Sequence, residues 1–327
     1  GFGRIGRLVL RAFCESHKKY DFEIVAINDL LNIDCAIHLL KYDSVHGRLN
    51  CDIRKISDKE ISIDGRRLAY ISEKSPTNLP WKNLKIDLVL ECTGIFKTKS
   101  DSQTHLKAGA KKVLISAPSK DADKTIVFGV NDDSIDINKD ITVSNASCTT
   151  NCLAPIIKAI HEEIGILNGF ATTIHSYTGD QRLVDMNHKD IRRSRAAAMN
   201  IIPTSTGATN AIEKIFPELK GKLSGLSVRV PTPNVSMLDF TFTTAKKSSI
   251  NDINEMIIKY ADGKLKNVLG YTKEPLVSLD FNHSPLSSIV DLTLTDVINS
   301  TIAHIVAWYD NEWGFANRIL DTAEKMF

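Results

Sequence analysis

The chain opens on Gly1-Phe2-Gly3-Arg4-Ile5-Gly6-Arg7, a Gly-x-Gly-x-x-Gly pattern that constrains the fold more than any other feature of the sequence. An apolar helical pattern follows at once, and residues 24–28 then form an apolar strand that ends before Asp29. In a dinucleotide-binding unit the glycines let the backbone approach a pyrophosphate at the helix N-terminus, and an acid about 20 residues later contacts a ribose. The pattern therefore predicts such a unit. Because its first strand precedes the first glycine, we expect a few residues before Gly1.

Short apolar runs separated by helical segments continue through the first half of the chain. The expected strands are 22–28, 87–91, 112–116, 125–130 and 141–144, with a hairpin at 60–71 around Asp64-Gly65. Such alternation predicts a parallel sheet covered on both faces. Ligands of these sheets bind beyond the carboxyl ends of the strands, so Thr93, Gly94 and Ser116 are expected near a cofactor.

The second half has longer strand-like runs. They are 169–176, 225–231, 236–244, 289–297 and 303–310, with helical patterns at 205–216 and 250–260. This order predicts an α+β domain whose mostly antiparallel sheet has helices on one face. Residues 177–200 are polar, basic and without periodicity, and a loop of that length inside a compact domain is usually functional.

The composition is that of a globular enzyme. A chain of 327 residues favours two domains, and a net charge of +2 gives no reason to expect nucleic acid or a membrane as the main partner. Six cysteines without regular spacing indicate a reducing compartment. Lys18-Lys19 and Lys111-Lys112 are interpreted as solvated charge pairs.

The segment from Ser144 to Cys152 places Cys148 in the first turn of a predicted helix. Free N–H groups and the helix dipole at that end are expected to lower the pKa of the thiol, which makes Cys148 a candidate nucleophile. The alternative is a small buried residue, the better interpretation for Cys14, Cys35, Cys51 and Cys92. Cys148 and Cys152 share a helix face, but no nearby Cys or His completes a tetrahedral metal site.

Candidate base and anion sites lie in the second half. His175 ends a predicted strand, where a histidine is either a base or a core residue. Arg192, Arg193 and Arg195 are clustered before 204–209, whose hydroxyls at a helix start suit a phosphate. Arg229 lies between two valines and needs a partner or a ligand; ion pairing is the alternative for each arginine.

Several motifs in order resemble phosphorylating glyceraldehyde-3-phosphate dehydrogenases of the bacterial type, over essentially the whole chain. They are Gly1 to Arg7, Lys41 to Arg48, Ser144 to Pro155, His175 to Gln181, Arg192 to Ala197, Thr204 to Thr209, Arg229 to Ser236 and Trp308 to Gly314.

The resemblance assigns roles to the residues. It implies Cys148 as the nucleophile and His175 as the general base. The family resemblance and the Gly-x-Gly-x-x-Gly pattern together place eight residues at NAD: Gly3, Arg4, Ile5, Asp29, Lys74, Thr93, Ser116 and Asn311. Those implied at inorganic phosphate are Ser147, Thr149, Arg195, Thr206 and Gly207, and those at the phosphate of the substrate are Thr178 and Arg229.

The resemblance also implies an architecture and an activity. Residues 1–146 would form a Rossmann-type NAD-binding domain, 147–311 the catalytic domain, and 312–327 a helix returning to the first domain. The implied protein is a cytoplasmic, glycolytic homotetramer, in which 177–200 borders the cofactor of a neighbouring subunit. It would convert glyceraldehyde 3-phosphate, NAD and inorganic phosphate to 1,3-bisphosphoglycerate through a thioester on Cys148.

Two other functions stay open at this stage. Erythrose-4-phosphate dehydrogenases resemble this family but lack its inorganic phosphate site, whereas Thr206 to Thr209 are intact here. A non-enzymatic thiol sensor on the same fold would need no aldehyde site. Two departures are noted: Met186-Asn187 replaces the Leu-Pro pair of NAD-specific relatives, and Phe315 replaces a tyrosine common near the nicotinamide.

Overall fold

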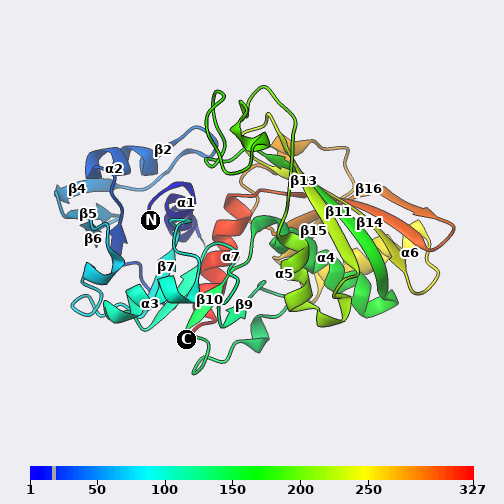
Figure 1. The fold of residues 1–327 in the computed structure, drawn as a ribbon, viewed down its shortest axis with the longest axis horizontal. Helices are drawn as coiled ribbons and strands as arrows, with labels where there is room; N and C mark the ends of the chain where they lie inside the picture. Colours follow the sequence, from blue (N-terminus) through cyan, green and yellow to red (C-terminus); the bar gives the residue numbers. More distant parts are fainter. Residues whose placement is uncertain (17–19) are drawn as a thin grey trace. The chain divides into compact units, whose positions relative to one another are not determined.

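The computed structural model describes residues 1–16 and 20–327, and its contacts divide the chain into two compact units (Figure 1). The first unit comprises Gly1–Ile126, Asp132–Ala146 and Ala316–Phe327. The second comprises Val127–Asn131 and Ser147–Phe315. Among the described residues, no helix is both long and apolar enough to cross a membrane.

The first unit is built around two four-stranded sheets. Its elements are α1 (Arg4–Glu15), β1 (Ala26–Asn28), α2 (Ile33–Lys41), β2 (Tyr42–Asp43), β3 (Gly47–Arg48), β4 (Ile53–Ser57), β5 (Glu60–Ile63), β6 (Arg66–Ile71), β7 (Leu88–Glu91), α3 (Lys99–Lys107), β8 (Lys112–Ile115), β9 (Lys124–Thr125) and β10 (Thr142–Ser144). The sheet β7-β8-β10-β9 is parallel throughout, which confirms the predicted parallel sheet.

The other sheet of this unit, β1-β6-β5-β4, is mixed. Strand β1 runs parallel to β6, whereas β6-β5 and β5-β4 are antiparallel hairpins. The predicted turn at Asp64-Gly65 is confirmed, and both residues have the positive φ that two-residue hairpin turns favour, 46° and 81°. The predicted hairpin at 60–71 thus pairs with β1 and β4 in a sheet of its own rather than joining the parallel sheet.

Two expectations for the first half are wrong. The strand predicted at 125–130 ends at Thr125, because the side chain of Asn131 accepts the N–H of Val127 and a turn replaces the strand. Lys112 is buried rather than solvated: its ammonium donates to the carbonyls of Ile137 and Met326. Lys18-Lys19 lie outside the described residues.

The second unit has one seven-stranded sheet in the order β12-β13-β11-β14-β17-β16-β15. Its elements are α4 (Cys148–Ile164), β11 (Ile166–Ser176), β12 (Ile202–Thr204), α5 (Ala208–Ile215), β13 (Leu223–Val230), β14 (Ser236–Thr244), α6 (Ile250–Asp262), β15 (Leu269–Thr272), β16 (Ser288–Ile298) and β17 (Ile302–Tyr309). The pairs β11/β13 and β15/β16 are parallel and the other four are antiparallel, so the predicted mostly antiparallel sheet is confirmed.

Helix α4 lies at the centre of this unit and contacts both α5 and α6. It begins where predicted, because the Ser147 side chain caps it by accepting the N–H of Thr150. Its apolar side chains Leu153, Ile156, Ile157 and Ile160 are fully buried. Burial of each such side chain contributes about 1.5–3 kcal/mol, so the core fixes the orientation of the helix and of its first turn.

The last helix, α7 (Trp313–Glu324), contains residues of both units, and Ala316–Phe327 belong to the first unit. Between β11 and β12 the loop 177–201 contains one short 3-10 turn, Arg192–Ser194, and no longer helix or strand. The long loop predicted at 177–200 is therefore confirmed.

Candidate active site

Two elements of the second unit bring a thiol and an imidazole together. Cys148 is the first residue of α4, and His175 is the penultimate residue of β11. The Cys148 Sγ lies 3.4 Å from the His175 Nε2, within hydrogen-bond distance for sulfur. Cys148 is half-buried, whereas His175 is buried. Nucleophile and base therefore have the mutual geometry that thiol catalysis needs.

The other ring nitrogen of His175 meets two polar groups. Nδ1 lies 2.7 Å from the carbonyl oxygen of Ser176 and 2.7 Å from Nη1 of Arg229. Nη1 also donates to that carbonyl at 3.0 Å. Burial and the positive charge of Arg229 lower the pKa of His175 to about 3, so the ring is neutral over the physiological range.

The thiol of Cys148 differs from the sequence expectation. Burial raises its pKa, while the charge of Arg229 and hydrogen bonds from Thr149 act in the opposite direction without overcoming burial. The expectation that the helix start alone lowers this pKa is wrong, because desolvation of the thiolate outweighs it. The resting pair is thus a thiol facing a neutral imidazole.

A tyrosine that the sequence did not single out supports this pair. The Tyr309 hydroxyl contacts the hydroxyls of Thr149 at 3.0 Å and Thr173 at 2.7 Å. Its ring meets the His175 ring edge-on, with 6.0 Å between centroids. Tyr309 therefore joins the first turn of α4 to β11 and fixes the imidazole from one side. The buried Cys152 instead contacts Ser288, and the described residues contain no cluster able to hold a metal.

Arg229 reaches His175 because their strands are register partners. On β13 it lies directly opposite His175 on β11, and the next strand, β12, places Ile202 opposite it on the other side. Burial lowers the pKa of Arg229, and the charge of Arg193 lowers it further. Anions near these two guanidinium groups would relieve their mutual repulsion, so the region is suited to binding phosphate groups.

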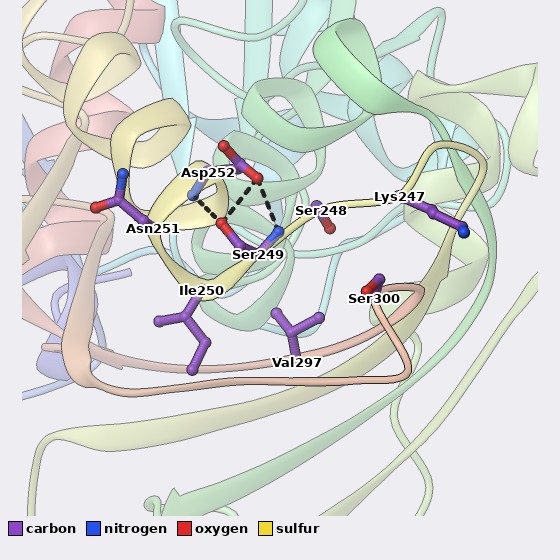
Figure 2. Close-up of a pocket in the computed structure, with 8 residues that line it drawn as sticks. All are labelled: Lys247, Ser248, Ser249, Ile250, Asn251, Asp252, Val297 and Ser300. Carbon is purple, nitrogen blue, oxygen red and sulfur yellow. Dashed lines mark hydrogen bonds between the residues drawn. The ribbon is translucent and has the colours of Figure 1, made fainter.

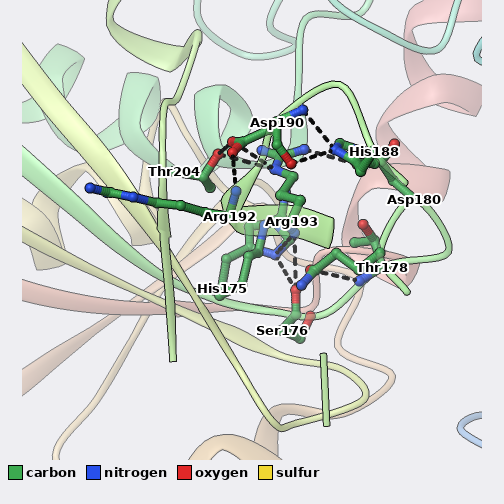
Figure 3. Close-up of polar contacts among 11 residues, drawn as sticks. His175, Ser176, Thr178, Asp180, His188, Asp190, Arg192, Arg193 and Thr204 are labelled. Atoms are coloured by element: carbon green, nitrogen blue, oxygen red, sulfur yellow. Dashed lines mark hydrogen bonds and ion pairs between the residues drawn. The ribbon is translucent and has the colours of Figure 1, made fainter. Parts of the chain in front are cut away.

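The arginine near this site is Arg193, and the structure does not bring Arg195 to it. Arg193 acts electrostatically on both His175 and Arg229, and it is hydrogen-bonded to Asp180 and Thr204 (Figure 3). The side chain of Arg195 is 62% exposed and donates to Asp185 at 2.8 Å. Arg192 is exposed and points away from the cluster (Figure 3). Spacing alone could not decide among the three, because the 3-10 turn at 192–194 sets their directions.

The other predicted anion ligands lie at helix starts and in the long loop. Gly207 precedes α5 and offers no side-chain cap, and the hydroxyl of Thr206 accepts the N–H of Ala208 at 3.2 Å. Ser147 caps α4, as described above. Thr178 follows β11, and its N–H donates to the side chain of Gln181.

Helix α6 provides a contrast to α5. At its start a polar hollow is lined by eight residues, drawn in Figure 2. The Asp252 carboxylate accepts the N–H and the hydroxyl of Ser249, and the Ser249 hydroxyl accepts the Asp252 N–H. This capping box places a negative charge at the helix start, so α6 is a poor anion site while α5 remains available.

Asn311 is held by two serines. Its Oδ1 accepts hydrogen bonds from the hydroxyls of Ser176 at 2.9 Å and Ser236 at 2.8 Å, and all three residues are buried. With its oxygen so engaged, the amide NH₂ group is the part of Asn311 left to recognise a ligand. The role of these two serines was not predicted from the sequence.

The predicted dinucleotide residues lie in the first unit. A Cβ at Gly6 would lie 2.2 Å from the carbonyl oxygen of Gly1, while Gly3 has open space around it and precedes α1 without a side-chain cap. The Asp29 carboxylate accepts the N–H groups of Phe2 at 2.5 Å and Leu31 at 2.9 Å. An uncapped helix start beside a fixed carboxylate fits a pyrophosphate and a ribose.

The remaining predicted cofactor residues surround this region. Thr93 follows β7 and Ser116 follows β8, so both lie at carboxyl ends of the parallel sheet as expected. The side chain of Arg4 forms a two-pronged pair with Asp43, Ile5 lies in the first turn of α1, and Lys74 is exposed.

Both halves of the chain match protein-family models of known function. Residues 1–99 match the family model of the glyceraldehyde 3-phosphate dehydrogenase NAD binding domain, and residues 147–311 match that of the C-terminal domain. The chain belongs to the glyceraldehyde-3-phosphate dehydrogenase family. NAD is accordingly the cofactor of the first unit.

Curated glyceraldehyde-3-phosphate dehydrogenases match nearly the whole chain. The plasmid-encoded protein of Cupriavidus necator is 51% identical over 99% of this chain and 96% of its own length. The protein of Xanthobacter flavus is 51% identical over 100% of this chain and 96% of its own length. The protein of Geobacillus stearothermophilus is 49% identical over 99% of this chain and 95% of its own length. The chain is therefore an oxidoreductase of this family.

Proposed function

We propose that the chain oxidises D-glyceraldehyde 3-phosphate with NAD and inorganic phosphate to 1,3-bisphosphoglycerate, the glycolytic reaction. The observation that carries the proposal is the 3.4 Å contact between Cys148 and His175, set beside the Arg193–Arg229 anion site. The relatives named above carry the activity in their names, and both domains of the family are matched.

The first step uses the resting proton arrangement of the pair. The step needs the tautomer in which Nδ1 donates to the Ser176 carbonyl and the lone pair of Nε2 faces Sγ; Arg229 Nη1 then donates to that same carbonyl, and its contact with Nδ1 is not a hydrogen bond. Nε2 takes the thiol proton as Sγ attacks the aldehyde carbon, and this proton passes to the carbonyl oxygen, giving a thiohemiacetal on Cys148. The neutral imidazole is then ready to accept the hydroxyl proton.

Oxidation follows with His175 as the base. NAD, when bound, supplies the acceptor of the hydride that leaves the thiohemiacetal carbon. His175 takes the hydroxyl proton as the C=O bond forms, which leaves a thioester on Cys148. Inorganic phosphate attacks this carbonyl, the C–S bond breaks, and the proton on His175 returns to sulfur as the acyl phosphate leaves.

Residue roles divide between the two units. In the first, Gly3, Arg4, Ile5, Asp29, Lys74, Thr93 and Ser116 hold NAD, and in the second Asn311 presents its amide to the nicotinamide carboxamide. Arg229 and Thr178 bind the phosphate of the substrate. The groups that bind inorganic phosphate are Ser147, Thr149, Thr206, Gly207 and, in place of Arg195, Arg193.

We further propose that the chain forms a homotetramer in the cytoplasm. Loop 177–201 exposes Leu183, Ile191 and Met199 at 86%, 84% and 83%, more apolar surface than a loop normally leaves to water. A neighbouring subunit would cover these side chains. All six cysteines are free, as a reducing compartment requires.

One assay tests the reaction and its nearest alternative. We expect NADH to form from glyceraldehyde 3-phosphate and NAD in multiple turnovers with phosphate, and in a single burst without it. Erythrose 4-phosphate should be a poor substrate, because the start of α5 with Thr206 and Gly207 provides a phosphate site. Equal turnover with and without phosphate would contradict the proposal, and so would inertness towards both aldehydes.

Iodoacetamide should label Cys148 before the buried or hydrogen-bonded thiols. Burial raises the pKa of Cys14 and Cys92 to about 11 and of Cys152 to about 12, and none of these three contacts a base. Cys148 can pass its proton to His175 as sulfur attacks, and activity should fall in step with its labelling. The measurement is peptide mapping by mass spectrometry at neutral pH.

The control for this labelling is a variant of the base. His175→Asn should slow the labelling of Cys148 while leaving the exposed Cys35 unaffected. If Cys14 or Cys152 is modified first while Cys148 stays intact, the assignment of the nucleophile is wrong.

A further inference from the structure

Arg193 belongs to a closed ring of hydrogen bonds (Figure 3). Its Nη1 donates to Asp180 Oδ2 at 2.9 Å, and its Nε donates to the Thr204 hydroxyl at 3.0 Å. That hydroxyl donates to Asp190 Oδ2 at 2.6 Å. The Asp190 N–H and Asp180 Oδ2 are then joined through the two ring nitrogens of His188, at 2.9 and 3.1 Å.

Every donor and acceptor in the ring has one consistent assignment. Because a backbone N–H always donates, His188 Nδ1 is the acceptor and Nε2 carries the proton that goes to Asp180. The Thr204 hydroxyl accepts a hydrogen bond from Arg193 and donates its single proton to Asp190. These hydrogen bonds stabilise the two carboxylates in their charged form. The bond from Thr204 lowers the pKa of Asp190. For Asp180, the hydrogen bonds from His188 and Arg193 outweigh the effect of burial and lower its pKa.

The ring of hydrogen bonds connects the Arg193 guanidinium to the seven-stranded sheet through Thr204. Thr204 is the last residue of β12 and pairs with Ser227 on β13, two positions from Arg229. Arg193 would otherwise move away from Arg229, because the two positive charges repel and Arg193 lowers the pKa of Arg229. The hydrogen bond from Nε to the Thr204 hydroxyl and the ion pair from Nη1 to Asp180 oppose this repulsion. They leave Nη2, for which the described residues provide no hydrogen-bond partner.

We propose that Asp180 and Thr204, closed into a ring by His188 and Asp190, are positioning residues that hold Arg193 against Arg229 to receive the attacking phosphate. The inference rests on the proposed function and assigns it four residues that do not touch a substrate. The ring acts in the second half-reaction only, since thioester formation needs Cys148 and His175 but no inorganic phosphate.

The loop contains a matched comparison. Asp185 and Arg195 form an ion pair of the same chemistry. The two aspartates are similarly exposed, 59% for Asp185 and 53% for Asp180, but Arg195 is 62% exposed against 20% for Arg193. An exposed pair of this kind contributes little to stability or orientation. Asp185→Asn is thus the control for Asp180→Asn, on the same loop and with the same change of charge.

The experiment compares these variants in two assays: the NADH burst without phosphate, and turnover against phosphate concentration. We expect Asp180→Asn to raise the KM for phosphate about 5–20-fold, less than the loss of a whole charge-assisted hydrogen bond because Arg193 keeps its charge, with the burst rate within about twofold of the parent. Thr204→Val, which keeps the shape but lacks the hydroxyl, should do the same. Thr204→Ser should restore the parent KM, and Asp185→Asn should leave it unchanged.

The outcomes separate the inference from the proposed function. If Arg193→Leu leaves the KM for phosphate unchanged, the proposed phosphate role of Arg193 is wrong. If Arg193→Leu raises it but Asp180→Asn and Thr204→Val do not, the guanidinium needs no ring and the inference fails. A loss of burst and turnover together in Thr204→Val, with Thr204→Ser equally impaired, means that the ring only holds the loop folded, which also overturns it.

Discussion

His175→Asn lowers the rate of the NADH burst from glyceraldehyde 3-phosphate by about 10²–10⁴-fold, the usual contribution of a positioned acid–base group. Asparagine keeps a polar side chain in the buried position but cannot take the thiol proton across the 3.4 Å contact to Cys148. Both the attack on the aldehyde and the loss of the hydroxyl proton are then slowed. Rapid-mixing measurement of the burst at saturating NAD gives this rate.

The control is a histidine elsewhere in the same sheet. His304→Asn removes a ring that is bonded to Asp239 between β17 and β14 and lies outside the site, so the burst should stay within about twofold. A near-parental burst in His175→Asn would remove this residue from the chemistry.

Local patterns in the sequence predicted the framework of the site. The helix that begins at Cys148 and the strand that ends near His175 are properties of contiguous segments, and each is found as predicted. The hairpin at Asp64-Gly65 was predictable for the same reason, because turn residues impose their own backbone conformation. The pairing of Cys148 with His175 came from the family resemblance.

The features that were missed depend on contacts between distant segments. Which arginine of the 192–195 cluster faces Arg229 is set by Asp180, Thr204 and Asp185, each of which lies several residues away. The pKa of Cys148 depends on burial by the whole unit, which a helix-start argument does not include. Lys112 was interpreted as solvated because its chain neighbour is charged, but its partners are carbonyls at Ile137 and Met326.

Arg229→Leu should reduce the preference for the phosphorylated aldehyde. Loss of one charge-assisted contact to the substrate phosphate costs about 1.5–3 kcal/mol, so kcat/KM for glyceraldehyde 3-phosphate relative to unphosphorylated glyceraldehyde should fall about 10–150-fold. The structure adds an effect on both substrates, because Arg229 also touches His175 and the Ser176 carbonyl. The ratio between the two aldehydes, rather than either rate, therefore reports phosphate binding.

Arg229→Leu should also change the pH dependence of the burst through its contact with His175. Arg229 is one cause that lowers the pKa of His175 to about 3, so its removal raises that pKa. A base works only above its pKa, and the acid limb of the burst rate should therefore move to higher pH in Arg229→Leu, for both aldehydes alike. His175→Asn, in contrast, slows both aldehydes and leaves their ratio near the parental value. If Arg229→Leu shifts the acid limb but keeps the ratio, Arg229 acts only on the base, and the substrate phosphate must bind elsewhere.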